Sequence, residues 1–167
     1  MRHDRMALLA ALLMGIGAAV AAADPPVLKA GMWEVVRTTT QQPDQKHTTT
    51  MCLDESVQAE MRELGMGIAK EMCSDHERHF EGGKLMSSAT CKMGNTTVKA
   101  RTTMTFSGNT AYHSETNAIY DPPLMNVKES KSVIEGKWAG LCKAGQQPGD
   151  ITLETGQTIN MKAMTKK

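Results

Sequence analysis

The sequence predicts a mainly β protein, an antiparallel meander that curls into a half or complete barrel, with one helix after the second strand. Two observations lead to this fold class. Most segments alternate apolar and polar side chains and are separated by turns rich in glycine, proline and asparagine, as in consecutive antiparallel hairpins. One segment after residue 53 instead spaces its apolar side chains three and four residues apart, which is the period of a helix. A long meander buries its apolar face by curling on itself or by packing against such a helix.

The first two strands are predicted at residues 32–40 and 47–52, which are both rich in β-branched residues. Between them, residues 41–45 contain proline and aspartate and are expected to turn the chain. Strand alternation places Trp33 and Val35 on the same face of the first strand. Because this face carries the larger apolar bulk, we expect it to be the core face.

The apolar stripe predicts a helix that begins at Asp54, whose carboxylate suits the N-cap position. Gly65 and Gly67 each destabilise a helix by about 1 kcal/mol relative to alanine, so this helix could end early. The stripe consists of Val57, Met61, Leu64, Ile68 and Met72.

The remaining strands follow one another through short turns. The clearest is at residues 97–106, where Met104 and Phe106 share one face and basic and polar side chains occupy the other. We expect a single domain over residues 24–149 and a loosely attached tail over residues 150–167. The other predicted strands are residues 73–80, 84–93, 112–120 and 127–138, with one short strand near 151–153 in the tail.

The four cysteines can form two disulfides in three ways. If the loop of the hairpin at residues 73–93 has three residues, Cys73 lies directly opposite Cys91, and Cys52 is left to pair with Cys142. A two-residue loop would place Cys73 and Cys91 on opposite faces. The alternative pairing, Cys52–Cys73 with Cys91–Cys142, stays open. Because no C-x-x-C motif occurs, we interpret the cysteines as structural rather than redox-active.

Residues 1–23 have the pattern of a secretory signal peptide that is cleaved after Ala23. A short basic leader precedes an apolar stretch at residues 6–20, and three alanines follow at the cleavage positions. An uncleaved membrane anchor is the alternative, but the stretch is shorter than the roughly 20 residues that a spanning helix needs. We therefore expect a periplasmic protein, in an oxidising compartment where cysteines pair.

The composition argues against several kinds of partner. Residues 1–23 contain two of the 19 basic and one of the 18 acidic residues, so residues 24–167 carry equal numbers of both. Nucleic acids and anionic membranes attract clustered lysine and arginine, and with 4% aromatic residues the chain offers few stacking platforms. We expect no nucleic-acid partner and, because no apolar run after Ala23 reaches membrane-spanning length, no transmembrane segment in the mature chain.

No motif in the sequence indicates catalysis or a cofactor. The G-x-S-x-G motif of hydrolases and a glycine-rich phosphate loop are both missing. His76 and His79 are the best candidates for metal ligands, but residues three apart on a strand point to opposite faces, so we expect no metal site. The dispersed methionines are interpreted as core-filling side chains rather than copper ligands.

Several short motifs occur in the same order as in a known family. The chain reads Lys29-Ala30-Gly31-Met32-Trp33-Glu34-Val35 near its start, then Cys52-Leu53, two further cysteines and a closing Gly140-Leu141-Cys142. Over residues 28–149 it resembles an uncharacterised family of small exported proteobacterial proteins, catalogued as a domain of unknown function. Members typically begin with K-P-G-x-W-E-V, so Ala30 departs from the usual proline. The resemblance implies a periplasmic location and structural cysteines, and it implies no activity, ligand or site.

Together, these observations favour an exported, disulfide-bonded protein that binds a ligand or associates with the envelope without catalysing a reaction. A curled sheet under a helix can leave an apolar cavity at its mouth, so the partner would be a small apolar ligand or an envelope component. A periplasmic enzyme, or a factor that handles metal or redox chemistry, is the alternative. The candidate ligand-lining residues, which could instead be plain core, are Trp33, Val35, Met104, Phe106 and Trp138.

Overall fold

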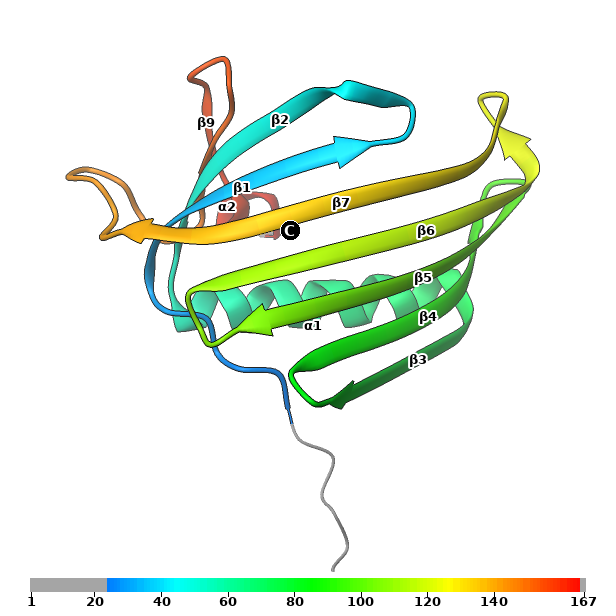
Figure 1. Cartoon of the computed structure of the whole chain (residues 1–167), viewed down its shortest axis with the longest axis horizontal. Coiled ribbons are helices and arrows are strands. Elements are labelled where there is room, and N and C mark those ends of the chain that lie inside the picture. The colour runs from blue at the N-terminus through cyan, green and yellow to red at the C-terminus, as the bar shows by residue number, and fades with distance from the viewer. Residues whose placement is uncertain (1–23, 166–167) are drawn as a thin grey trace, which may run out of the picture.

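A curled antiparallel sheet and a long helix across one of its faces make up the structure, a computed structural model that describes residues 24–165 (Figure 1). The segment interpreted as a signal peptide lies outside the described residues. The sheet has nine strands and two free edges, β3 and β9, so it is curled but not closed. The predicted fold class is confirmed in its half-barrel form.

The strands lie across the sheet in the order β3-β4-β5-β6-β7-β1-β2-β8-β9. The run from β3 to β7 is the predicted meander, and pairing of β7 with β1 joins the first hairpin to it. The strands are β1 (Gly31–Thr39), β2 (Gln42–Leu53), β3 (Cys73–Glu81), β4 (Lys84–Met93), β5 (Thr96–Ser107), β6 (Ala111–Leu124), β7 (Val127–Gly140), β8 (Asp150–Thr152) and β9 (Thr158–Asn160).

The first turn lies earlier than the sequence predicts. Thr39 pairs with Gln42, so Pro43 belongs to β2 and not to a turn over residues 41–45. The reason is that β2 pairs with β8 only at Thr50 and Met51, which leaves its first half as a sheet edge. A proline is tolerated on such an edge because its missing N–H has no partner to lose.

The segment expected to be a loosely attached tail contributes to the sheet. The strand β8 pairs with β2, β9 pairs with β8, and a short helix α2 (Met161–Thr165) follows. The side-chain amide of Asn160 donates to the carboxylate of Asp150 at 2.7 Å, and Met161 packs against the core. Residues 150–161 are therefore tied to the domain by backbone pairing and by apolar contact.

The helix α1 (Glu55–Met72) begins where the sequence predicts, and it does not end early. The carboxylate of Asp54 accepts a hydrogen bond from the Val57 N–H at 2.8 Å, which is the N-cap interaction. Gly65 and Gly67 do not interrupt it. Their cost of about 1 kcal/mol each is offset because the core holds the first turn and the chain passes directly into β3 at the other end.

The core lies at one end of the molecule, where the start of α1 meets β1 and β2. Trp33, Leu53 and Val57 are almost completely buried there, with exposed fractions of 0–2%. The ring of Tyr112 stacks on Trp33 with centroids 5.8 Å apart. Gly136 makes room for this stack, because a Cβ at that position would overlap the Tyr112 ring. The partly buried residues that complete this core are Leu28, Val35, Met51, Trp138 and Met161.

Candidate functional site

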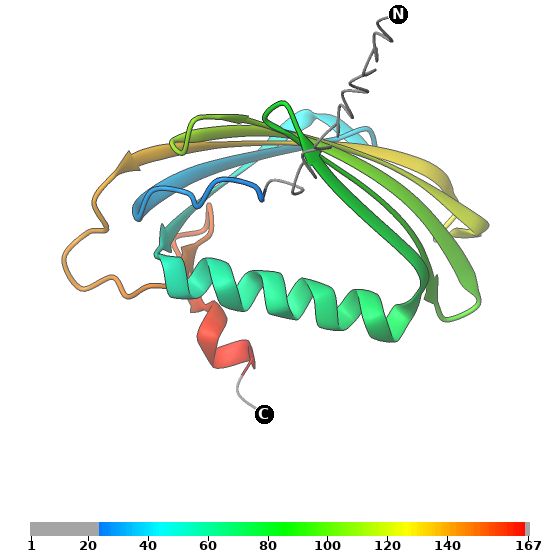
Figure 2. The same ribbon diagram turned by 90° about the horizontal axis from the view of Figure 1, so that it is seen from below.

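Beyond its first turns, α1 crosses the concave side of the sheet without burying its apolar stripe (Figure 2). Val57 is fully buried, but Met61, Leu64, Ile68 and Met72 are 40–49% exposed. An apolar stripe of a helix normally packs against the core of its own domain. Its exposure over three turns therefore indicates apolar space that the protein itself does not fill.

The first two turns of α1 border a cavity of about 430 Å³, which we call the helix–sheet cavity, and Met61 is the residue of the exposed stripe that lines it. Its volume falls within the range of small-molecule binding sites. Its walls come from the sheet, from α1 and from the segment at residues 24–28, and most of them are apolar. The lining residues are Asp24, Pro25, Pro26, Val27, Leu28, Trp33, Met51, Leu53, Gln58, Met61, Arg62, Arg78, Leu85, Met104, Phe106 and Tyr112.

The sheet wall follows from strand register. Leu85 pairs with Met104 across β4 and β5, and Phe106 pairs with Tyr112 across β5 and β6. Side chains of paired residues point to the same face, so these four form one apolar patch on the concave side. Phe80 at the edge contacts Phe106 edge-on, with ring centroids 6.0 Å apart. Burial raises the pKa of the Tyr112 hydroxyl, which therefore stays neutral at the cavity wall.

The segment at residues 24–28 forms a third wall and is held by Gln58. The Gln58 side chain accepts from the Leu28 N–H at 2.8 Å and donates to the Leu28 carbonyl at 3.0 Å. One buried amide thus satisfies both backbone groups of Leu28, as a neighbouring strand would. The Lys29 N–H also donates to the Asn109 carbonyl at 2.8 Å, which fixes the segment against the β5–β6 turn.

Three charged residues line the mostly apolar cavity. Arg62 comes from α1, Arg78 from β3 and Asp24 from the leading segment, and all three are exposed. Among the described residues, neither arginine forms an ion pair. The arrangement combines an apolar interior with unpaired positive charge at its boundary.

The structure brings together three of the five candidate ligand-lining residues. Trp33, Met104 and Phe106 line the cavity, whereas Val35 and Trp138 do not. Both of these pack against the Trp33 core, and the Trp138 indole donates to the Ala30 carbonyl at 3.0 Å.

The sequence interpretation missed Arg62, Arg78, Gln58 and Tyr112. Tyr112 could have been found from its place opposite Phe106 in the β5–β6 hairpin. Gln58 and Arg62 lie on α1 and Arg78 lies on β3, the next element in the chain, and the sequence does not show that these two elements border one cavity with β4, β5 and β6.

The structure contains the disulfides Cys73–Cys91 and Cys52–Cys142, which is the pairing that the sequence favours. The loop of the β3–β4 hairpin is shorter than the three residues predicted. Glu81 pairs with Lys84, so the loop has two residues, Gly82 and Gly83, both with positive φ. The register then shifts between Cys73 and Asp75, and this irregularity returns Cys73 to a position opposite Cys91.

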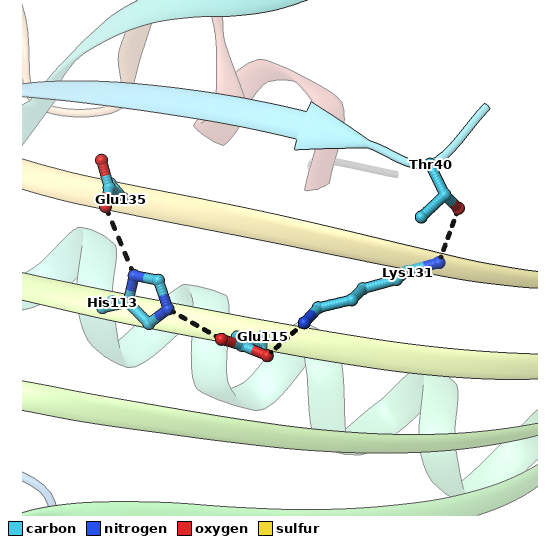
Figure 3. Close-up of polar contacts among 5 residues, drawn as sticks. All are labelled: Thr40, His113, Glu115, Lys131 and Glu135. Atoms are coloured by element: carbon cyan, nitrogen blue, oxygen red, sulfur yellow. Dashed lines mark hydrogen bonds and ion pairs between the residues drawn. The ribbon is translucent and has the colours of Figure 1, made fainter. Parts of the chain in front are cut away.

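A polar network on the convex face is the main competing site. His113 on β6 contacts Glu115 at 3.3 Å and Glu135 at 3.4 Å, and Lys131 contacts Glu115 at 2.8 Å (Figure 3). The backbone N–H of Lys131 also donates to the Thr40 hydroxyl at 3.0 Å. A cleft of about 300 Å³ lies beside His113 and Glu135.

The electrostatics of this network do not favour acid–base chemistry. Hydrogen bonds from Lys131 and His113 lower the pKa of Glu115 below its ordinary value, so it stays a carboxylate. A general base works best with a pKa raised towards the operating pH, which is the opposite shift. His113, Glu115 and Glu135 are all 42–67% exposed, as expected for a solvated surface network.

Metal and redox sites have little support among the described residues. No group of three or more histidine, cysteine or acidic side chains is placed to hold a metal ion in that part of the chain. His76 and His79 occupy β3 three positions apart, and His79 contacts Glu81 at 3.2 Å.

Neither α1 nor α2 combines the length and the hydropathy that a membrane crossing requires.

Comparison with known proteins supports the resemblance to an uncharacterised family. No curated protein and no solved structure matches the chain. One family model matches residues 28–142, which is more than half of the sequence and includes β1 to β7 together with α1. Its description, protein of unknown function (DUF3617), assigns no activity, and on this match the chain belongs to the DUF3617 family.

Proposed function

We propose that this protein is an exported, periplasmic binding protein that takes up a small apolar ligand in the helix–sheet cavity and does not transform it. The observation that carries the proposal is the cavity of about 430 Å³ between the start of α1, which contributes the half-exposed Met61, and the apolar patch of the sheet. Leaving this much apolar surface uncovered is unfavourable, at about 25 cal/mol per Å², and a ligand that covers it recovers that energy.

Three observations support export. The structure holds two disulfides and, among its described cysteines, no free thiol, which fits an oxidising compartment. Residues 1–23 carry the basic, apolar and small-residue pattern of a signal peptide. The family resemblance implies small exported proteins of proteobacteria, in which that compartment is the periplasm.

The proportion of methionine in the lining favours a carrier with broad tolerance. Met51, Met61 and Met104 line the cavity from β2, α1 and β5. Unbranched thioether side chains adapt to ligands of different shape, which suits a binding surface better than a precise catalytic site. The closed lining of an enzyme that positions reacting groups would need more convergent polar side chains.

The proposal is tested with the uncharged fluorescent dye N-phenylnaphthylamine, whose emission rises in apolar surroundings. Oxidised protein recovered from the periplasm should bind the dye. Replacing Met61 with asparagine should weaken binding by about tenfold, because a cavity wall loses much of an apolar side chain.

The matched control is Met66→Asn, the same change on the same helix at a residue that does not line the cavity. Dye binding should be unaffected there. Equal dye affinity in both variants and the wild type, with unchanged unfolding midpoints, would show that the cavity is not the binding site. Mass spectrometry of the native protein should in addition show a bound molecule that organic solvent extracts.

A further inference from the structure

Arg62 and Arg78 reach the helix–sheet cavity from different elements, α1 and β3. The lining between them is almost entirely apolar. A guanidinium beside apolar surface is a strong recognition group, because its charge is screened less there than in open water. The question is whether these charges serve the protein's own stability or a ligand.

The local sequence supplies no acidic partner to Arg62. On a helix, side chains interact with those three and four residues away. Glu60 and Glu63 stand at other spacings, and Glu60 instead lies 3.5 Å from Lys162. The residues at the interacting spacings are Gln58, Ala59, Gly65 and Met66.

The same holds for Arg78 on its strand. Residues two apart on β3 share its face, and these are His76 and Phe80. Its cross-strand neighbour on β4 is Ser87. On the sheet Lys131 pairs with Glu115 at 2.8 Å, whereas other strand residues such as Arg101 form no ion pair with a described residue. What distinguishes Arg62 and Arg78 is that both line the apolar cavity, where they are available to an anionic group of a ligand.

Asp24 is the one acidic residue in the described lining. Cleavage after Ala23 would make Asp24 the first residue of the mature chain, and its new α-ammonium group would offset its own carboxylate. The cavity boundary would then keep a positive balance from Arg62 and Arg78. An anion is the matching ligand group, and a planar carboxylate fits a guanidinium through two parallel hydrogen bonds.

We infer that the ligand is an amphipathic anion of the free fatty acid class, with its chain in the helix–sheet cavity and its carboxylate at Arg62 and Arg78. This inference rests on the proposed function and adds the chemical class of the ligand to it. The volume of about 430 Å³ lies at the small end of the range for ligand sites, which suits a single-chain molecule better than a two-chain phospholipid.

The test compares two ligands that differ only in the head group, dodecanoate and dodecanol, as competitors that displace N-phenylnaphthylamine. Dodecanoate should bind the wild type about tenfold more tightly than dodecanol. Replacing Arg62 or Arg78 with glutamine should weaken dodecanoate binding about fivefold more than it weakens dodecanol binding. Arg101→Gln is the matched control, since Arg101 is an exposed arginine of β5 outside the lining.

The possible failures are distinguishable. If dye and dodecanol bind but dodecanoate binds no better, or if Arg62→Gln and Arg78→Gln behave like Arg101→Gln, the anion inference is wrong and the cavity proposal stands. If neither the dye nor either ligand binds, the proposed function fails. Vesicles of phosphatidylglycerol test whether the protein binds a membrane surface instead of a free fatty acid. Sedimentation of the protein with vesicles, without binding of monomeric dodecanoate, would overturn the inference in favour of a lipid surface.

Discussion

At the scale of single residues, Trp33 shows how one buried side chain can belong both to the core and to the lining of the cavity. Its ring is fully buried, it stacks on Tyr112, and its indole N–H donates to the Lys29 carbonyl at 2.8 Å. It also lines the helix–sheet cavity, so it is both the centre of the core and the floor of the candidate site.

Replacing Trp33 with alanine should destabilise the protein by about 3–5 kcal/mol, because a large buried side chain is lost and a cavity remains. Urea unfolding measures the loss. Trp138→Ala is the natural comparison, since that ring is only partly buried and should cost less. A loss below about 1 kcal/mol for Trp33→Ala would contradict its role in the core and favour a purely ligand-facing one.

At the scale of elements, α1 differs from an ordinary amphipathic helix in where its stability comes from. Only its first turns pack on the core, so its stability depends more on its N-terminal cap. Asp54 accepts hydrogen bonds from the Val57 N–H and from the Ser56 hydroxyl. The first of these is the main reason that the pKa of Asp54 lies below its ordinary value.

A group whose pKa is lowered on folding stabilises the folded state above its unfolded pKa and loses this effect as the pH falls through its folded pKa. Asp54→Ala should therefore cost about 1 kcal/mol at neutral pH. The difference from wild type should shrink once the pH falls below the ordinary carboxyl value of 3.8. Urea unfolding at several pH values measures this difference in stability. Asp54→Asn retains an acceptor but does not titrate, so its stability difference from Asp54→Ala should not depend on pH. A constant difference between Asp54→Ala and wild type at all pH values would contradict the assignment.

Other elements show which local features the sequence determines. Most strand positions were predicted because alternation and glycine turns are local patterns, and the N-cap at Asp54 was predicted from the helix stripe that follows it. The two-residue turn at Gly82 and Gly83 and the irregularity after Cys73 were not, because loop length and register compensate each other. The shorter loop and the register shift cancel, so the predicted disulfide pairing is right although the predicted loop length is wrong.

At the scale of the whole molecule, the sequence could not show that most of the apolar stripe of α1 stays about half exposed. Periodicity shows which residues share a face of the helix, but it does not show how closely that face packs against the sheet. The same stripe would be expected of a packed helix. Met104 and Phe106 were accessible to prediction because they lie on one clear strand, whereas Arg62 and Arg78 meet at the cavity only through the tertiary path of the chain.

The two disulfides constrain the molecule on different scales. Cys73–Cys91 spans 18 residues and joins strands that a hairpin already pairs. Cys52–Cys142 spans 90 residues and ties the end of β2 to the chain just beyond β7, on either side of β1. It therefore fixes one of the places where strands distant in the sequence meet within the described sheet, the β7–β1 junction, next to the Trp33 core.

The loop-closure entropy of the unfolded chain grows with loop length, so the two bonds should differ in their effect on stability. Replacing Cys52 and Cys142 together with alanine should cost about 4–5 kcal/mol, and replacing Cys73 and Cys91 together should cost about 3 kcal/mol. Urea unfolding of the two double variants under oxidising conditions gives the ranking. An equal or reversed ranking would mean that the hairpin bond does more than close its own loop, for example by holding β3, whose Arg78 lines the cavity. In that case, dye binding should fall in the hairpin variant and survive in the other, which separates a constraint on the unfolded chain from one on the helix–sheet cavity.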